Sequence, residues 1–322
     1  MMHIAIIGAG LAGLTLASRL RAAHTVTVFE KARGSGGRMS TRRADPYAFD
    51  HGAQYFTQRS EAFGAFLQPF LAQGLVQEWP VDIHDERSGS AAQKVRYVAV
   101  PGMNTVCKAL AATLNVYTGC HIERLQRSAG GWSLSAMTGE SYGPFDWVIS
   151  SAPAPQTAAL LPSDFTGQAA LDKVKMAGCF ALMLGFEAPL DLEADAFRPD
   201  NSPIGWAAVN ASKPGRPVSY SLLIQSTNVW AEAHLEERQE RVQEALLDAA
   251  SSLLAHDLSS ASHQVLHRWR YAATPKPAGA PFLLDEDLQL AACGDWCLGS
   301  KVEAAFESAD ALAQHFEADP AS

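Results

Sequence analysis

Three glycines near the N-terminus have the spacing of a phosphate-binding turn. Gly8, Gly10 and Gly13 follow an apolar β-branched run at residues 4–7 and precede a stretch rich in alanine and leucine. In such a strand, turn and helix unit, the first glycine permits the tight turn, the second lets the backbone approach a pyrophosphate, and the third lets the helix pack closely on the strand. The free N–H groups and the positive dipole end of the helix would then face the phosphates.

A carboxylate at the end of the second β run indicates that the ligand is a dinucleotide. The second β run, residues 25–30, ends in Glu30, about 20 residues downstream of the glycine turn. At that place a carboxylate accepts hydrogen bonds from a ribose diol and disfavours a ribose that carries a 2′-phosphate. A buried strand with incidental glycines would not need all three spacings and the acid together, so we predict a dinucleotide-binding unit.

A second glycine-rich turn follows at once, and it contains two arginines. Residues 33–38 read RGSGGR. Bare glycine amides and a guanidinium fork both suit a pair of phosphates. Since a nicotinamide-type domain needs only the first turn, the second one indicates a different dinucleotide.

The elements that position these residues are predicted from apolar periodicity. With 322 residues, 48% of them hydrophobic, the chain is long enough for about two domains with sizeable cores. From about residue 174 the β runs become longer and predict an antiparallel sheet. Its strands are expected at residues 179–187, 204–210, 218–226 and 263–272, with a charged amphipathic helix at residues 234–255. The last segment, residues 288–316, returns to strand, glycine turn and helix.

Composition argues against several classes of protein. A net charge of −9 disfavours a general nucleic-acid binder, because such proteins carry a basic surface. Five cysteines, an odd number in apolar surroundings, argue against a disulfide framework and favour a reducing compartment. No apolar run reaches the roughly 20 residues that span a membrane, and the apolar stretch at residues 4–17 lacks the preceding Lys or Arg of a signal peptide. We expect a cytoplasmic protein with neither nucleic-acid nor membrane partners.

Seven motifs, taken in order along the chain, resemble those of one family. They are AIIGAGLAGL, EKARGSGGRMSTRR, FDHGAQYF, VPGMN, ISSAPAPQ, HRWRYA and CGDWCLGSKVEAAFES, and their span covers most of the chain. They resemble the flavin-dependent amine oxidase superfamily of glutathione-reductase-like flavoproteins, and within it most closely the renalase family and its bacterial members. The implied fold class is α/β, with a glutathione-reductase-like, Rossmann-type FAD-binding domain and a second α+β substrate domain built on an antiparallel sheet.

The two expected domains are interleaved along the chain. The discontinuous FAD-binding domain would comprise residues 1–78, 98–170 and 288–322, and the substrate-binding domain residues 79–97 and 171–287. The sheet of the second domain, with flanking helices, is expected to cover the flavin and form the substrate cavity.

The resemblance implies that the dinucleotide is non-covalent FAD. Gly36, Gly37 and Arg38 would lie against its diphosphate. Asp295 would bind the ribityl or diphosphate part, and a helix beginning near residue 301 would aim its N–H groups at the flavin N1/C2=O edge, where negative charge develops on reduction. The implied cofactor contacts are Gly8, Gly10, Gly13, Glu30, Lys31, Gly36, Gly37, Arg38, Gly52, Ala53, Gln54, Asp295, Lys301 and Val302.

The resemblance also implies an oxidase with a small-molecule substrate. Similarity to bacterial renalases implies oxidation of the 1,2- and/or 1,6-dihydro isomers of NAD(P) to NAD(P)⁺, with hydride passed to the flavin and O2 reduced to hydrogen peroxide. Planar walls would suit so flat a substrate. The candidates for its pocket are Tyr55, Phe56, Trp269, Arg270 and Trp296, while Arg268 and Lys301 could also face substrate phosphates. No residue is assigned as an acid or base, since His51 and His267 fit a structural role better.

Other chemistries stay open or are set aside. An amine oxidase acting on a small amine or polyamine is an alternative, although no lysine can be assigned near flavin N5. An NAD(P)H-dependent flavin monooxygenase and a non-catalytic, redox-sensing FAD protein are two more. Cys293 and Cys297 lack a second Cys/His pair of zinc spacing, so no metal is expected. The order Gly-Ser-Lys at residues 299–301 departs from that of a phosphate loop.

Overall fold

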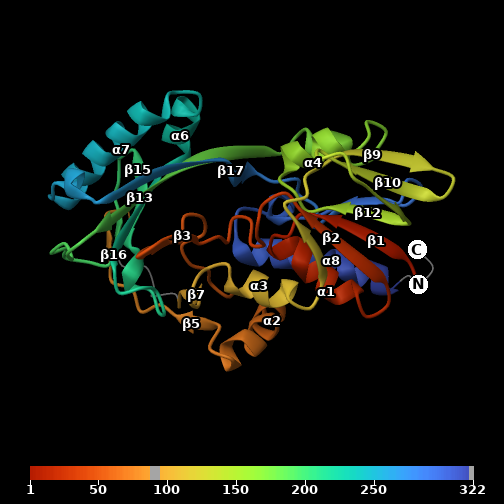
Figure 1. The fold of residues 1–322 in the computed structure, drawn as a ribbon, viewed down its shortest axis with the longest axis horizontal. Coiled ribbons are helices and arrows are strands. Elements are labelled where there is room, and N and C mark those ends of the chain that lie inside the picture. Colours follow the sequence, from red (N-terminus) through yellow and green to blue (C-terminus); the bar gives the residue numbers. More distant parts are fainter. Residues whose placement is uncertain (88–94, 319–322) are drawn as a thin grey trace. The chain divides into compact units, whose positions relative to one another are not determined.

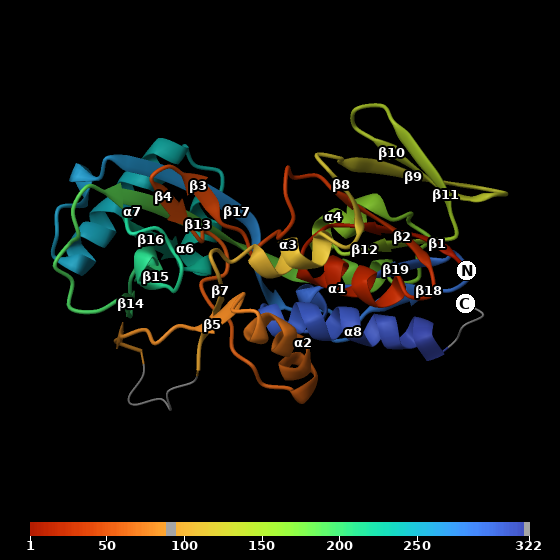
Figure 2. The same cartoon turned by 60° about the horizontal axis from the view of Figure 1, so that its bottom comes forward.

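The chain folds into two compact units, each assembled from separate segments of the sequence. The computed structural model describes residues 1–87 and 95–318 (Figures 1 and 2). Unit 1 comprises Met1–Met39, Asn104–Met176 and Thr274–Ser322, and unit 2 comprises Ser40–Met103 and Ala177–Ala273. In the described residues, no helix is both long enough and apolar enough to cross a membrane.

Unit 1 is organised around a sheet of mainly parallel strands, in the order β18-β19-β12-β1-β2-β8. The strands are β1 (His3–Ile7), β2 (Thr25–Glu30), β8 (Asn115–Thr118), β12 (Trp147–Ser150), β18 (Leu283–Asp285) and β19 (Leu290–Ala292). Neighbours pair in parallel, except that the edge strand β18 is antiparallel to β19. The apolar run of β1 is explained by its central place, since such a strand is buried on both faces.

Helices and a small second sheet complete unit 1. They are α1 (Leu11–Leu20), α3 (Thr105–Ala111), α4 (Ala154–Leu160), α5 (Gln168–Leu171), η3 (Asp295–Cys297) and α8 (Val302–Ala318), with β9 (Ile122–Ser128), β10 (Gly131–Ala136) and β11 (Ser141–Phe145). α1 connects β1 to β2 and lies beside α8 (Figure 2). Arg19 of α1 forms ion pairs with Asp310 and Glu317 of α8, the second at 2.7 Å.

Unit 2 is organised around a six-stranded sheet in the order β17-β13-β16-β15-β14-β6. The strands are β6 (Ile83–Asp85), β13 (Lys175–Phe186), β14 (Ala196–Arg198), β15 (Ile204–Val209), β16 (Tyr220–Ser226) and β17 (His263–Lys276). β13, β16, β15 and β14 are successively antiparallel, whereas β14 and β6 are parallel. The other elements are β3 (Arg42–Ala44), β4 (Tyr47–Phe49), β5 (Val76–Glu78), β7 (Tyr97–Ala99), α2 (Glu61–Ala72), α6 (Asn228–His234), α7 (Gln239–Leu254), η1 (Asn210–Ser212) and η2 (Leu258–Ser260).

Different elements cover the two faces of the unit 2 sheet. The apolar stripe of α7 packs with Phe180 and Leu182 of β13. The hairpin of β3 and β4 packs with Ala181 and Met183 of the same strand. Because successive side chains of a strand point to opposite faces, this alternation assigns even positions of β13 to the helix and odd positions to the hairpin.

The helix predicted over residues 234–255 is wrong at its start. α6 ends at His234, and α7 begins only at Gln239. The guanidinium of Arg268 donates a hydrogen bond of 2.5 Å to the Leu235 carbonyl, which in a continuous helix would pair with the N–H four residues later. A tertiary contact that sequence periodicity does not reveal therefore accompanies the break.

The compact units differ from the predicted domains chiefly at residues 40–78. These residues are predicted to belong to the FAD-binding domain, yet they cluster with unit 2. The reason is that the β3–β4 hairpin buries Tyr47 and Phe49 against the unit 2 sheet. Residues 98–103 likewise fall in unit 2 and residues 274–287 in unit 1. Within the predicted segment 79–97, residues 88–94 lie outside the described residues.

Candidate functional site

The first glycine turn has the geometry that its spacing predicts. The Gly8 N–H donates to the Phe29 carbonyl at 2.8 Å, so the turn is attached to β2. A Cβ on Gly13 would lie 2.0 Å from the Gly8 carbonyl oxygen, which only glycine avoids. Among the described residues, a Cβ at Gly10 would meet nothing within 4 Å, and no side chain caps the first turn of α1. The helix N-terminus is therefore open to a ligand beside Gly10.

Glu30 lies at the end of β2, next to this turn. Its carboxylate accepts a hydrogen bond from the Ala9 N–H at 2.8 Å and another from the Ala32 N–H at 2.7 Å. The residue is only 8% exposed. These two bonds fix a buried negative charge beside the phosphate turn, as the ribose-binding assignment requires.

The second glycine turn lies against the first. The Gly36 N–H donates to the Ala9 carbonyl at 2.9 Å. Gly36 and Gly37 have φ angles of +130° and +53°, which are backbone conformations that residues other than glycine rarely adopt. A Cβ on Gly37 would lie 3.5 Å from Gly10 Cα. The two motifs, separate in sequence, therefore form one glycine-lined surface.

Arg38 extends this surface toward the C-terminal motif. Its Nη1 and Nη2 atoms lie 2.8 and 2.6 Å from the two carboxylate oxygens of Asp295. The adjacent Gly294 N–H donates to Ser308 of α8 at 2.8 Å, which ties the turn to that helix. Asp295 is 7% exposed, so this bidentate pair is strong and geometrically fixed.

The residues of unit 1 fit a dinucleotide diphosphate. They offer glycine amides without side chains and an uncapped helix N-terminus, both of which favour phosphate oxygens, and beside them the Arg38 guanidinium, whose two Nη atoms pair with Asp295. α8 begins at Val302, as predicted, with Lys301 exposed before it, and Lys31 is exposed just after Glu30. Burial raises the pKa of the Cys297 thiol to about 12, which keeps it protonated and agrees with a non-covalent cofactor.

This fold and these turns define a nucleotide-binding flavoprotein. Residues 6–70 match the NAD(P)-binding Rossmann-like domain, and residues 84–315 match flavin containing amine oxidoreductases. The chain belongs to the flavin containing amine oxidoreductase family. It is an FAD-dependent oxidoreductase, and the predicted fold class and cofactor are confirmed.

Solved structures share this fold over nearly the whole chain. A putative protoporphyrinogen oxidase from Exiguobacterium sp. 255-15 aligns with a TM-score of 0.78 and 13% identity, over 98% of this chain and 99% of that one. Wild-type putrescine oxidase bound to putrescine aligns with a TM-score of 0.72 and 12% identity, over 99% of each chain. Identities this low establish the fold alone.

A curated relative matches over a short segment. The 4,4′-diapophytoene desaturase of Staphylococcus haemolyticus (strain JCSC1435) is 52% identical over 52 residues, which are 16% of this chain and 10% of the desaturase. Because the match spans a tenth of that enzyme, it supports a shared segment and does not extend to its substrate.

Two predicted walls of the substrate pocket belong to cores instead. Trp296 is 0% exposed, and its indole N–H donates to the Ala152 carbonyl at 3.0 Å within unit 1. Phe56 is 4% exposed and is bridged to Tyr97 in unit 2. Apolar packing explains both aromatic rings, so we withdraw them as substrate walls.

The other predicted substrate residues lie in unit 2 and are half-buried or exposed. Tyr55 packs against Trp206, with ring centroids 5.5 Å apart. The Trp269 indole N–H donates to the His51 carbonyl at 2.8 Å. Arg270 does not stand free, because its guanidinium pairs with Glu236 at 2.5 Å on an exposed surface. We therefore do not assign Arg270 to substrate phosphates.

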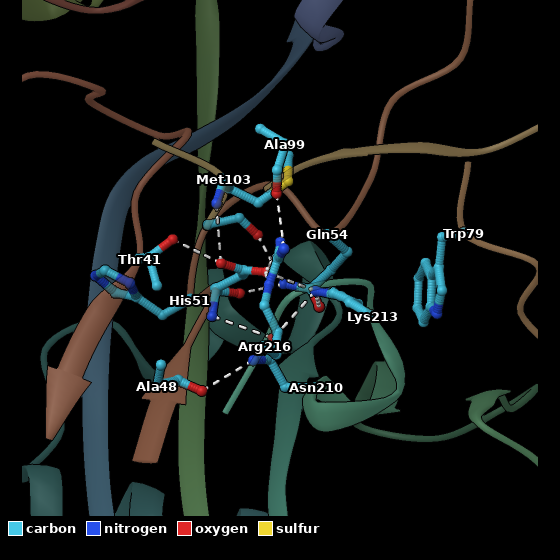
Figure 3. A network of polar contacts seen from close by, with 12 residues as sticks. Thr41, Ala48, His51, Gln54, Trp79, Ala99, Met103, Asn210, Lys213 and Arg216 are labelled. Carbon is cyan, nitrogen blue, oxygen red and sulfur yellow. Dashed lines mark hydrogen bonds and ion pairs between the residues drawn. The ribbon is translucent and has the colours of Figure 1, made fainter. Parts of the chain in front are cut away.

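A buried ion cluster in unit 2 is not predicted from the sequence (Figure 3). Asp50, which follows β4, lies 3.2 Å from Lys213 Nζ and 2.7 Å from Arg216 Nη2, and all three side chains are 0% exposed. Its second oxygen accepts hydrogen bonds from the Thr41 hydroxyl at 2.6 Å and the Met103 N–H at 3.2 Å. Burial alone would raise the pKa of Asp50, but Lys213 and Arg216 hold it below its usual value. With two cations and one carboxylate, the cluster is positively charged.

Lys213 is saturated by its neighbours in this cluster. Its ammonium donates to Asp50 at 3.2 Å, to Gln54 at 3.2 Å and to Asn210 at 3.1 Å. It also lies 5.3 Å from the centroid of the Trp79 ring (Figure 3). Burial lowers the pKa of Lys213 to about 8, although Asp50 opposes this effect. Because all three donors have acceptors, the geometry makes Lys213 a structural cation.

The cluster fixes the loop that leaves β4. The Gln54 amide donates to the Asp50 carbonyl at 2.5 Å and to the Gly52 carbonyl at 3.1 Å. Gln225 of β16 also donates to the Gly52 carbonyl, at 2.7 Å. Gly52, Ala53 and Gln54 are thus held rigidly within unit 2, and their contact with FAD stays a prediction.

Proposed function

We propose that this flavoprotein is a renalase-type oxidase of 1,2- and/or 1,6-dihydro-NAD(P). The overall reaction converts the dihydronicotinamide, O2 and one proton into NAD(P)⁺ and hydrogen peroxide. FAD, when bound, supplies the two-electron redox chemistry. Gly10 and Gly37 would hold its diphosphate, Arg38, paired with Asp295, would lie against it, and Glu30 would bind its adenosine ribose.

A local excess of positive charge inside unit 2, the candidate substrate-binding unit, supports the proposal. Lys213 and Arg216 share the single carboxylate of Asp50, and Arg42 of β3 adds a further positive charge that reaches His51. A positive site attracts an anionic dinucleotide and repels a cationic amine, so it discriminates between the two substrate classes. Although the fold is shared with putrescine oxidase, this charge favours the dinucleotide.

The residues of this chain would bind and orient the substrate without a protonating side chain. Burial lowers the pKa of His51 and that of His267 to about 4, so both imidazoles are neutral near pH 7. The Trp269 ring lies 4.4 Å from that of His267, centroid to centroid, and offers a planar surface for a flat ring. The ring nitrogen of a dihydronicotinamide carries the ribose and has no proton to lose before hydride transfer, so this substrate needs no base, whereas a primary ammonium substrate does. The neutral imidazoles agree with such a substrate.

The test is anaerobic mixing of the purified holoenzyme with single donors. We would follow the oxidised flavin band at about 450 nm after adding 1,2-dihydro-NAD, 1,6-dihydro-NAD, ordinary NADH or putrescine. The proposal expects rapid bleaching by one or both isomers and, on admission of air, recovery of the band with stoichiometric peroxide. Bleaching by putrescine alone would instead establish an amine oxidase, and bleaching by NADH alone would indicate a monooxygenase-type flavoprotein.

A further inference from the structure

One face of the unit 2 sheet changes from apolar to polar along its length. Beneath the β3–β4 hairpin it presents Ala181, Met183 and Leu223. Two residues beyond Leu223 on the same strand is Gln225, whose amide donates to the loop that follows β4. Alternate residues of β17 share this face, since His263 stacks on Phe49 at 5.4 Å. The polar end of this face is therefore formed by the next alternate residues of β16 and β17.

His51 and His267 lie together at this polar end. Their ring centroids are 4.9 Å apart, and the Trp269 ring is 5.2 Å from that of His51. His51 is 7% exposed, yet its Nδ1 atom has no hydrogen-bond partner within 3.5 Å in the part of the chain that the structure describes. A buried polar nitrogen without a hydrogen-bond partner costs folding free energy, so a ligand that supplies the missing hydrogen bond would gain binding free energy.

The hairpin brings Arg42 to the same place. In the β3–β4 register Arg42 is directly opposite Phe49, so its side chain leaves the hairpin on the face that carries Phe49. His51 is two residues beyond Phe49. Arg43, opposite Ala48, leaves on the other face and is exposed.

Arg42 has no ion-pair partner in residues 1–87 and 95–318, although it is half-buried. The carboxylate next to His51 in sequence, that of Asp50, is fully engaged with Lys213 and Arg216 on one oxygen and with Thr41 and Met103 on the other. The guanidinium therefore offers its fork to a ligand, and such a fork suits phosphate oxygens.

We propose that Arg42, His51 and His267 form a subsite that binds a phosphate group of the substrate. The identity of the ligand as a dinucleotide substrate rests on the proposed function. The subsite itself is defined by residues of unit 2 alone. Arg42 would pair with the phosphate, and the imidazoles would donate N–H groups to it. The positive charge of the Asp50, Lys213 and Arg216 cluster would strengthen the attraction through a low-dielectric interior.

The experiment uses the FAD-loaded full-length protein and inorganic pyrophosphate as the probe. The imidazole Cε1–H resonances of His51 and His267 would be assigned by NMR with His51→Gln and His267→Gln, then followed during titration with pyrophosphate and, separately, succinate. We expect pyrophosphate to shift both resonances. Arg42→Gln should weaken pyrophosphate binding about tenfold or more, as expected for loss of a charged hydrogen-bonding partner, whereas Arg43→Gln should change it less than about twofold.

Three results would overturn the subsite. These are unmoved imidazole resonances, equal weakening by Arg42→Gln and Arg43→Gln, and a response to succinate without one to pyrophosphate. None involves turnover, so the subsite and the proposed function fail separately. Pyrophosphate binding that depends on Arg42, in an enzyme that oxidises no dihydronicotinamide, would refute the function and leave the subsite in place.

Discussion

At the scale of single residues, Asp50 is a fully buried charge of unit 2. Its two oxygens serve four partners, which are Lys213, Arg216, Thr41 and Met103. A buried ion pair of this kind adds little stability over an apolar replacement, but removal of one partner leaves an uncompensated charge. Loss of the Asp50 charge would leave two uncompensated charges, those of Lys213 and Arg216.

We therefore predict that Asp50→Asn destabilises the protein by about 3–5 kcal/mol. The substitution keeps the shape of the side chain but leaves Lys213 and Arg216 buried without a counter-charge. Urea unfolding of the holoenzyme would measure the free energy, with Asp45→Asn in the exposed hairpin turn as the control. Equal unfolding free energies for the two variants would show that the cluster is not held by its carboxylate.

His51 gives a second prediction at this scale, for acid pH. The pKa of His51 is lowered from 6.5 to about 4 in the folded protein, first by burial and then by the charges of His267 and Arg42, while the Phe49 backbone and the charge of Asp50 oppose this shift. The unfolded chain therefore binds more protons between these values, and stability is lost as the pH falls from 6.5 toward 4. The slope from this group reaches at most about 1.4 kcal/mol per pH unit.

The measurement is the unfolding free energy of wild type and of His51→Gln at several pH values between about 7 and 4.5. This interval covers most of the range in which the folded and unfolded states bind different numbers of protons at His51. The variant should lose stability less steeply on acidification. His121→Gln, at an exposed position, should keep the wild-type slope. An unchanged slope in His51→Gln would mean that His51 is protonated in the folded state at the usual pH.

At the scale of elements, the approach of α1 to β1 depends on one glycine. A Cβ at position 13 would meet the Gly8 carbonyl oxygen at 2.0 Å, and that atom is backbone, so the helix itself must move. The N–H groups of α1 and the surface formed with Gly37 would then be displaced. This links a packing contact to the cofactor site.

Gly13→Ala should therefore cost about 1–3 kcal/mol of stability, as overpacking does, and most of the bound flavin. The ratio of flavin to protein absorbance after dialysis, together with the thermal midpoint, would measure both effects. Gly130→Ala, in the exposed turn between β9 and β10, is the control, because a Cβ there would lie 4.0 Å from its nearest neighbour, the Ser128 hydroxyl. If Gly13→Ala retained full flavin, the close approach of helix and strand would be irrelevant to binding.

At the scale of the whole molecule, the predicted diphosphate surface is assembled from distant segments of one compact unit. Gly10 and Gly37 come from the first segment of unit 1, and Asp295 comes from the last. FAD bound there would tie these segments together and stabilise the folded state by mass action. At a free FAD concentration of about 100 times the Kd, this stabilisation is about 2.7 kcal/mol.

We predict that removal of FAD lowers the thermal midpoint and that adding it back raises the midpoint in a concentration-dependent way. Glu30→Gln should need a several-fold higher FAD concentration for the same increase, because the amide lacks the negative charge that we propose binds the ribose diol. Glu123→Gln, an exposed acid on β9, is the control. A midpoint in Glu30→Gln that rises at the wild-type FAD concentration would refute the assignment of Glu30 to the ribose.

The sequence by itself determined the local units of this protein. The glycine spacing and Glu30 predicted the nucleotide turn, the RGSGGR turn indicated FAD, and the long apolar β runs predicted four strands of the unit 2 sheet, β13, β15, β16 and β17. These signals are readable because backbone sterics and strand alternation act over a few neighbouring residues.

Only the tertiary structure decided which charged and aromatic groups meet. Asp50 and Lys213 are 163 residues apart, and the loop composition around Lys213 does not distinguish a buried lysine from an exposed one. Trp296 has the sequence context of a ligand wall but is enclosed by the unit 1 core. Arg270 forms an ion pair with Glu236, whereas Arg42 has no ion-pair partner in the described residues. Burial and pairing depend on long-range packing, so local pattern carries no record of them.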